Sequence, residues 1–447
     1  MPLEPLQIPM LYGKVAIAAV ALTHALFATF IVGSSLIGVS TETAGWLAGK
    51  GRYDRLARMI AFTLILTTAA VSFLGVTLVF LLNIFWPRFW STLFRIMFWP
   101  LLLEAVLFLA EAVFAYAWYY SWDWAEAGQS RKRVHLLFGW LAAGSALAAM
   151  MMIDMVASYM LTPRPPHLLW ERLFNPTMIH LHLHRWFGNL TWTGFALSAL
   201  CAWAFLRADN DEDRQHYRWA GGYCFMIGFG GLLVMPVIGY EYLLRIRYEQ
   251  PQAFHTLMLG GRSWLFDLVA LLYSLLIILG TLYIARILKA APRHGSSHLV
   301  SAVSLAVVTA AGIVLCMPYH LQHVPFLSSL TDLTVNPFGK MQPNKYFALS
   351  FLVLFGLLNW IYFVRGFSGR HHWWPDRKDP AEDRTAPKVL ISLSVGAMLV
   401  MLTMGWVRET ARAWNGYLIY GVMSFEEERR HYQPAAENRD AHKGIDE

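Results

Sequence analysis

The sequence predicts an all-α integral membrane protein, built as a bundle of about ten transmembrane helices. Of its 447 residues, 57% are hydrophobic and only 15% are charged, whereas soluble domains carry about 25% charged residues. The apolar residues lie in long blocks, and a helix that crosses a bilayer needs about 20 of them in succession. Helices are favoured because they satisfy their own backbone hydrogen bonds in lipid. The same composition excludes a disordered chain, a collagen, a coiled coil and a disulfide scaffold.

Ten apolar blocks follow one another along the chain, and each is long enough to span the bilayer. In order, they cover residues 13–39, 56–84, 93–120, 134–160, 180–206, 217–243, 262–287, 299–318, 346–366 and 388–408. The segment before the first block contains Glu4 and no basic residue until Lys14, so the first block is predicted to be a retained helix and not a cleaved signal peptide. No repeat separates the blocks, so residues 1–423 are expected to form one transmembrane helical domain. The charged residues 424–447 are predicted to be a polar C-terminal tail.

The lysines and arginines of the connections predict the orientation of the chain. There are 19 of them in and beside the odd-numbered connections, against 9 in the even-numbered ones. Connections rich in lysine and arginine stay on the cytoplasmic side, so both termini are predicted to lie outside. The expected location is the inner (cytoplasmic) membrane of a bacterial-type cell, with the chain crossing it many times.

The net charge of +7 does not indicate a nucleic-acid partner, because the basic residues form short clusters between apolar blocks. Membrane lipid is the expected surrounding. The three cysteines, Cys201, Cys224 and Cys316, lie in or next to apolar blocks and are interpreted as small buried side chains. No Cys-x-x-Cys-His sequence occurs, so the chain carries no covalently attached c-type haem.

Ionisable side chains inside the apolar blocks are costly and therefore indicate function. His24 lies within the first block. Glu104 and Glu111 lie in the third block, seven residues and almost two helical turns apart, so both project from one face. Buried carboxylates must be protonated, paired or bound to a metal. Asp154 and Asp267 also fall within blocks and could line a proton route.

A second group of side chains is predicted to lie near the outer face. In chain order these are His180, His182 and His184 at the start of the fifth block, His255 and Met258 at the mouth of the seventh, and Glu409 and Arg412 at the end of the tenth. His180 and His184 share a helical face from which His182 is excluded, so at most two of the three are expected to be ligands.

Haem accounts for this combination of residues. Its iron takes histidine, methionine or an anionic side chain as axial ligand, and the porphyrin needs apolar walls. A low-spin haem that transfers electrons needs two strong axial ligands, whereas a high-spin haem that binds a gas keeps one position open. Other interpretations stay open at this point: a structural hydrogen bond for His24, solvated histidines at the helix ends, and ordinary core packing for Met258.

Four segments occur in a characteristic order, namely LTHALFATFIVG, ETAGWLAGKGRYDRLAR, LLLEAVLFLAEAVFAYAWYYSWD, and MVASYMLTP followed by NPTMIHLHLH. Together they resemble subunit I of the cytochrome bd-type quinol oxidases, over roughly the first 250 residues and again near the end. The resemblance implies that His24 serves the high-spin haem pair and that His184 binds the low-spin haem. Glu111 matches the second glutamate of that family, whereas Glu104 sits one residue closer than the family spacing.

The chain also departs from that family. RIRYEQPQ replaces the long outer loop that the family uses for quinol. Met258 is one residue out of register with the family's low-spin methionine, with His255 where an arginine would stand, and a rival alignment puts Leu352 at the ligand position. Glu409 and Arg412 keep the final E-x-x-R, but the Gln-Pro that follows it in the family is absent. Ten blocks also exceed the family's usual nine.

The resemblance implies a terminal oxidase subunit, an oxidoreductase of the respiratory chain. Electrons from a quinol or cytochrome c would pass through a low-spin haem to a high-spin haem site that reduces dioxygen. The predicted catalytic residues are Glu104 and Glu111, as iron ligand and proton relay. The metal ligands would be His24, His184, Glu104 and Met258, and further cofactor-binding candidates are His180, His255, Glu409 and Arg412.

The cofactor expected is haem b, in two or three copies, with haem d as the alternative at one of them. The resemblance implies a second membrane subunit of similar size, with c-type cytochromes as further candidate partners. Two other functions remain open. One is a haem-b electron-transfer module of a larger respiratory complex, linked to quinone or cytochrome c, without oxygen reduction. The other is a transporter or scaffold whose buried acids move protons or ions.

Overall fold

The structure is a computed structural model that describes residues 13–165, 167–258, 262–289, 295–317, 343–368 and 384–413. Ten long helices run through these residues: α1 (Gly13–Ala48), α2 (Gly51–Phe85), α4 (Phe98–Tyr120), α6 (Gln129–Tyr159), α8 (Met178–Arg207), α9 (Asp211–Glu249), α11 (Trp264–Lys289), α12 (Gly295–Cys316), α13 (Pro343–Ser368) and α14 (Thr385–Ala413). Each overlaps one of the ten predicted blocks, with ends that differ by up to nine residues, and the third block also includes the end of α3. Four short helices join them: α3 (Pro87–Ile96), α5 (Trp122–Ala125), α7 (Leu169–Leu173) and α10 (Pro251–Met258).

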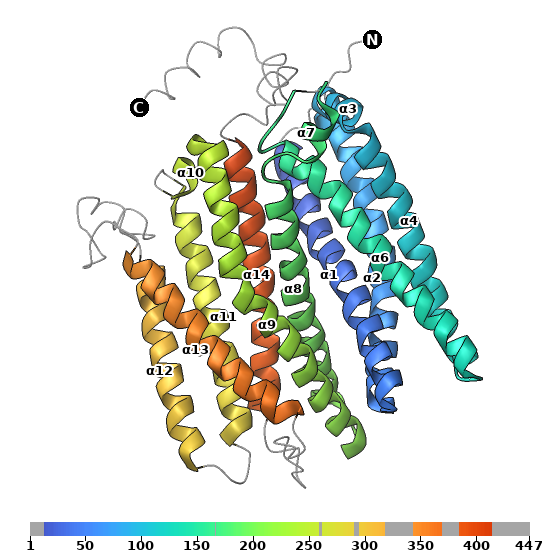
Figure 1. Cartoon of the computed structure of the whole chain (residues 1–447), viewed down its shortest axis with the longest axis vertical. Helices are drawn as coiled ribbons and strands as arrows, with labels where there is room; N and C mark the ends of the chain where they lie inside the picture. The colour runs from blue at the N-terminus through green and yellow to red at the C-terminus, as the bar shows by residue number, and fades with distance from the viewer. Residues whose placement is uncertain are drawn as a thin grey trace.

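Nine of the described helices are long and apolar enough to cross a membrane, and α12 contributes a shorter apolar stretch, Val300–Cys316. The prediction of an all-α multi-pass membrane protein is therefore confirmed. Successive long helices run in opposite directions, so that α3, α7 and α10 lie at one end of the bundle (Figure 1). This end is called the α7 end below, and the other end, which holds the α1–α2 turn, is called the α5 end.

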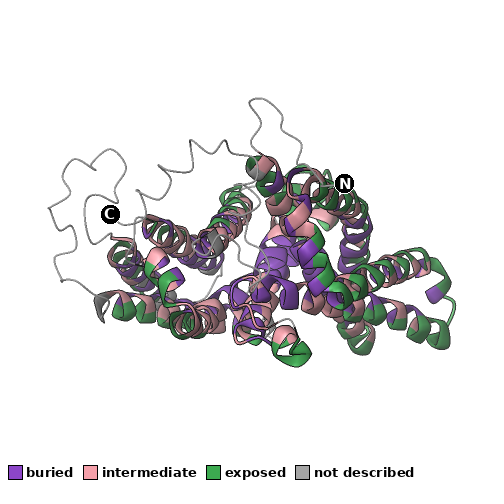
Figure 2. Cartoon of the chain, turned by 90° about the horizontal axis from the view of Figure 1, so that it is seen from above, coloured by how far each residue is buried: buried purple, intermediate pink, exposed green. Residues whose placement is uncertain are grey.

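The helices pack as two groups that meet along α8. Helices α1, α2, α4 and α6 enclose one apolar cluster, which includes Leu64, Trp118 and Ala142. Helices α8, α9, α11 and α14, with α12 and α13 at their side, enclose a larger one around Phe225 and Phe229. Seen from above, buried residues concentrate where the groups meet, and exposed residues cover the outer helix faces (Figure 2). Those faces are apolar, as a lipid-facing surface must be.

Glycines set the closest helix contacts. A Cβ at Gly194 in α8 would lie 2.4 Å from the backbone nitrogen of Gly228 in α9, so only glycine allows the two backbones to approach this closely. A Cβ at Gly33 in α1 would likewise lie 2.1 Å from Oγ1 of Thr193 in α8. These contacts hold α8 firmly between α9 and α1, which places its histidines at the junction of the two groups.

Candidate functional site

His24 lies in α1 and faces α2. A Cβ at Gly75 would come within 3.2 Å of the imidazole Cε1, so the absence of a side chain at Gly75 leaves room beside the ring. The backbone of Val71 lies near the ring but forms no hydrogen bond of normal geometry with it. Its Nδ1 atom is buried and has no hydrogen-bond partner among the described residues. The imidazole is therefore held in an apolar setting with an unused ring nitrogen.

Glu104 and Glu111 lie on one side of α4, as their spacing predicts. Glu111 is buried, with 2% of its surface exposed, and its Oε1 atom has no partner in the part of the chain that the structure describes. Glu104 is half-buried and lies almost two helical turns nearer the α7 end. The two carboxyl groups thus follow one another along the same side of α4.

His184 lies in α8 and faces α9. A Cβ at Gly239 would lie 3.6 Å from the imidazole Cε1, and the ring of Tyr242 is 6.0 Å away between centroids. Nδ1 of His184 is buried without a described partner, and so is Nδ1 of His180, one turn earlier. His182 differs, because its Nδ1 lies 2.9 Å from Oδ2 of Asp154 in α6. These contacts agree with the prediction that His180 and His184 share a helical face and that His182 points elsewhere.

His255 and Met258 belong to α10, a short helix that directly precedes the seventh long helix, α11, and is separate from it. The reason is local: α9 continues to Glu249, and Pro251 starts a new helix directly afterwards. His255 is exposed. Met258 is half-buried and packs against the same apolar cluster as Tyr242, the ring neighbour of His184.

The remaining predicted residues have mixed environments. Leu352 in α13 is fully buried within the larger apolar cluster. Glu409 forms an ion pair of 2.9 Å with Arg408, and the side chain of Arg412 lies outside the described residues. Asp267 forms an ion pair of 2.9 Å with Lys345 of α13.

These residues suit haem better than a bare metal ion. Among the described residues, no group of three or more histidines, cysteines or acidic residues could hold a metal ion. Haem iron needs only one or two axial side chains, and the porphyrin packs against apolar walls. His24 and His184 each offer an enclosed, unpartnered imidazole nitrogen beside a glycine. Both lie in the half of the bundle toward the α7 end (Figure 1).

A polar network near the α5 end was missed by the sequence analysis. Glu42 is fully buried, and its Oε1 lies 2.5 Å from Nζ of Lys132 and 2.8 Å from Nε2 of His135. Lys132 also contacts Asp54 at 2.8 Å, and the indole of Trp118 donates to Glu42 at 2.7 Å. The predicted apolar block ends at residue 39, whereas α1 continues through Glu42 to Ala48, so the block boundary excludes Glu42 from the helix.

A second cluster lies between α6 and α8. Asp154, named above as part of a proton route, is fully buried and paired with both His182 and Arg185. Arg185 follows His184 directly and was not singled out by the sequence analysis. A basic residue within an otherwise apolar helix was the signal for it.

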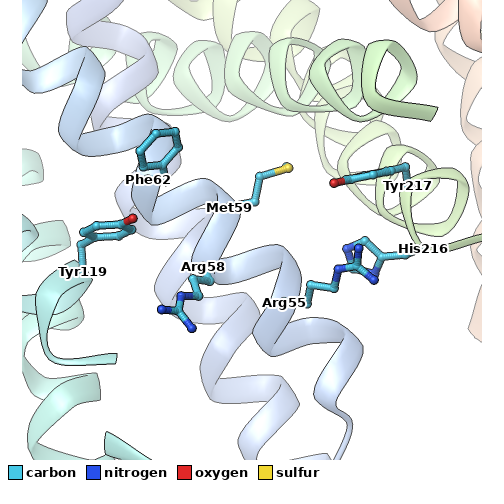
Figure 3. A pocket seen from close by; sticks show the side chains of 7 residues that line it. All are labelled: Arg55, Arg58, Met59, Phe62, Tyr119, His216 and Tyr217. Carbon is cyan, nitrogen blue, oxygen red and sulfur yellow. The ribbon is translucent and has the colours of Figure 1, made fainter. Parts of the chain in front are cut away.

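A hollow of about 260 Å³ opens near the α5 end between α2, α4 and α9 (Figure 3). Its walls are formed by Arg55, Arg58, Met59, Phe62, Tyr119, His216 and Tyr217. The two arginines are paired with Asp213 and Asp123 respectively. None of the predicted ligands lines this hollow, so it is separate from the candidate haem site.

Comparison with known families finds that the one described as cytochrome bd terminal oxidase subunit I matches residues 13–436. Among solved structures, that of the bd oxidase from Geobacillus thermodenitrificans matches with a TM-score of 0.50 and 17% sequence identity, over 89% of this chain and 96% of that chain. At this identity the match shows the fold alone. A search of curated proteins finds none that matches the chain.

Proposed function

Because this chain belongs to the cytochrome bd terminal oxidase subunit I family, we propose that its unpartnered histidines, together with Glu104 and Glu111, bind the haems of a bd-type oxidase and carry protons for the reduction of dioxygen. The chain is a bd-type oxidase subunit, a multi-pass membrane oxidoreductase of a respiratory chain, and the family implies haem cofactors. We propose in addition a number of haems, their types and the roles of single residues.

The observation that best supports this proposal is the contrast between two sets of buried polar groups. Nδ1 of His24, Oε1 of Glu111 and Nδ1 of His184 are buried without a hydrogen-bond partner among the described residues. The buried carboxylates Glu42 and Asp154, by contrast, have partners on neighbouring helices. Leaving a buried polar group unpaired costs about 1–3 kcal/mol. A bound cofactor would supply partners for these three atoms.

In this proposal His184 holds a low-spin haem, with Met258 as the candidate second ligand. His24 and Glu104 serve a high-spin site in the other helix group. When bound, the haem irons supply the electron-transfer and oxygen-reduction chemistry. Two or three haems b are proposed, with haem d as the alternative at the high-spin site.

Glu111 is proposed to hold and pass a proton, because its carboxyl group is enclosed and has an oxygen without a partner. Its neighbour Glu104 lies two turns nearer the α7 end and is half-buried. A proton moving from Glu111 toward Glu104 would travel along one face of α4, away from the ionic network around Glu42. Enclosure by apolar side chains keeps the proton from leaking to water.

The bd-type relatives imply a membrane complex with a second subunit, and quinol as the electron donor. For this chain we propose both. The α7 end would face outward, since the connections at the α5 end carry most of the lysines and arginines. Alkaline phosphatase fusions after residue 208 and after residue 250 test this orientation, and the fusion after 250 is expected to be the active one.

One observation favours the second candidate function, a haem-b electron-transfer module linked to quinone or a c-type cytochrome. A single residue, Gln250, separates α9 from α10, so this connection holds no long loop that could cover a quinol. Such a module would have no need for the paired carboxyl groups of Glu104 and Glu111. Their presence favours the oxidase.

The test is an optical spectrum of the purified complex, reduced with and without carbon monoxide. The oxidase proposal expects both a low-spin signal and a high-spin signal that changes with carbon monoxide. Purely low-spin bands would support the electron-transfer module. A well-folded, colourless protein would overturn both proposals.

A further inference from the structure

We propose that Arg185 binds a propionate carboxylate of the haem beside His24, and that Asp154 positions its guanidinium group for that contact. This inference rests on the proposed haem-binding function and adds a binding residue to it. Arg185 would contact a carboxylate at the edge of the cofactor, whereas His24 and His184 would bind iron.

Asp154 holds the guanidinium group of Arg185 in place. Oδ1 of Asp154 accepts a hydrogen bond from an NH1 group of Arg185, and Oδ2 lies 2.9 Å from Nδ1 of His182. Each carboxylate oxygen thus has one partner, and Asp154 itself is fully buried. This ion pair restricts the orientation of the Arg185 side chain, because Asp154 and Arg185 belong to two packed helices, α6 and α8.

Most N–H donors of the Arg185 guanidinium group remain available after its contact with Asp154. A guanidinium group has five N–H donors in a planar fork. Within the described residues, Asp154 is the one acceptor recorded for Arg185, and it occupies a single nitrogen. The Arg185 side chain is only 24% exposed. Free donors of this kind, partly withdrawn from water, match the paired oxygens of a carboxylate.

The position of Arg185 in the bundle supports the same contact. Arg185 lies on α8 between His184 and Trp186, and Trp186 packs against the buried cluster that contains Val32 of α1 and Met150 of α6. Close to this point α8 is bound to α1, because the indole of Trp192 donates a 3.0 Å hydrogen bond to the carbonyl of Leu26. Arg185 therefore lies at the junction of the two helix groups, on the side of α8 that faces α6 and the helix group that carries His24.

The simpler role for Arg185 is to neutralise Asp154, and the experiment must separate the two. Removing Arg185 alone would leave Asp154 buried without its cation, which is destabilising in either case. The informative variant is Asp154→Asn combined with Arg185→Gln, which removes both charges. Arg185→Lys is the second variant, because it keeps the charge and loses the planar fork.

The measurement is the haem content and the midpoint potential of each haem in the assembled complex, by spectroelectrochemistry. Without Arg185 the propionate charge is uncompensated and favours the oxidised iron. At a fixed potential the ratio of reduced to oxidised high-spin haem should fall about tenfold in the double variant, equivalent to a potential lower by roughly 59 mV for one electron. Arg185→Lys should shift it in the same direction by less.

The matched control is Arg58→Gln combined with Asp123→Asn, an arginine–aspartate pair of 2.9 Å near the α5 end. It should leave both quantities unchanged. If the Asp154/Arg185 double variant also keeps wild-type haem content and potentials, Arg185 only neutralises Asp154 and the inference is wrong. A wild-type complex without haem would instead refute the proposed function, so the two failures are distinguishable.

Discussion

The indole nitrogen of Trp118 in α4 donates a 2.7 Å hydrogen bond to the buried carboxylate of Glu42 in α1. The ring fits between two glycines, because a Cβ at Gly38 would lie 2.7 Å from it and one at Gly139 would lie 3.1 Å from it. This contact ties together three helices of the group that carries His24 and Glu111. The stability of that group can therefore be probed at positions far from the proposed haem ligands.

Gly139→Val should destabilise the protein, since its new side chain would collide with Trp118 and with Val39, which lies 2.7 Å from the Cβ position. Overpacking of this kind costs about 1–3 kcal/mol. Gly144→Val is the control, because it lies on the same helix with nothing within 4 Å of the Cβ position. Thermal unfolding in detergent would measure the difference, and equal midpoints for both variants would contradict the packing argument.

Lys132→Met should cost more. Its ammonium group is shared by Glu42 and Asp54, and Glu42 is fully buried. Breaking a buried ion pair by removing one partner costs about 3–5 kcal/mol. The loss in unfolding midpoint should be partly recovered by adding Glu42→Gln, which removes the stranded charge. No recovery in the double variant would mean that Lys132 acts through its packing alone.

His184→Ala should remove the low-spin haem band while the protein still inserts into the membrane, because the substitution deletes the proposed iron ligand and little apolar packing. His167→Ala is the control, an exposed histidine in the connection before α7. Reduced-minus-oxidised spectra of both variants give the answer. An unaltered band in His184→Ala would rule out this ligand.

Met258→Leu tests the second axial position of the same haem. Leucine keeps the volume of methionine and loses its sulfur, so the packing of α10 should survive while the low-spin band weakens or becomes high-spin. His255→Ala, three residues earlier and exposed, should leave the band intact. The reverse pattern, a change with His255→Ala and none with Met258→Leu, would assign the position to the histidine.

Glu111→Gln should slow oxygen turnover far more than haem reduction by an added reductant, because glutamine cannot pass a proton. A positioned proton-transfer group contributes roughly 100-fold or more to a rate. Stopped-flow reduction and oxygen-electrode turnover on one preparation separate the two steps. Equal slowing of both rates would argue against a proton-transfer role.

Much of the fold could be predicted because it depends on properties of single segments. Every one of the ten apolar blocks is a long helix, since about 20 apolar residues in succession leave a chain in lipid no other open structure. The exceptions were short or mixed segments. Helix α10, with His255 and Met258, has eight residues and no long apolar run, so its sequence did not separate it from the helix that follows.

Local spacing also predicted which side chains share a face, as with Glu104 and Glu111, or with His182 set apart from its two neighbours. It could not predict the partners of the buried charges. Glu42 pairs with Lys132, 90 positions away, and Asp154 pairs with Arg185, 31 positions away. Residue order along the chain carries no sign of these pairings, because they arise only when helices distant in sequence pack against each other.

The membrane class, the helix positions and the candidate ligand types thus follow from composition and spacing, since hydrophobicity and helical periodicity are local quantities. Packing alone settled which polar groups are satisfied within the protein and which are left over. The reason is physical: a hydrogen bond or ion pair needs two atoms within about 3 Å. Only the assembled bundle brings Glu42 to its partners, while Glu111 and His184 each keep an atom unpaired among the residues that the structure describes.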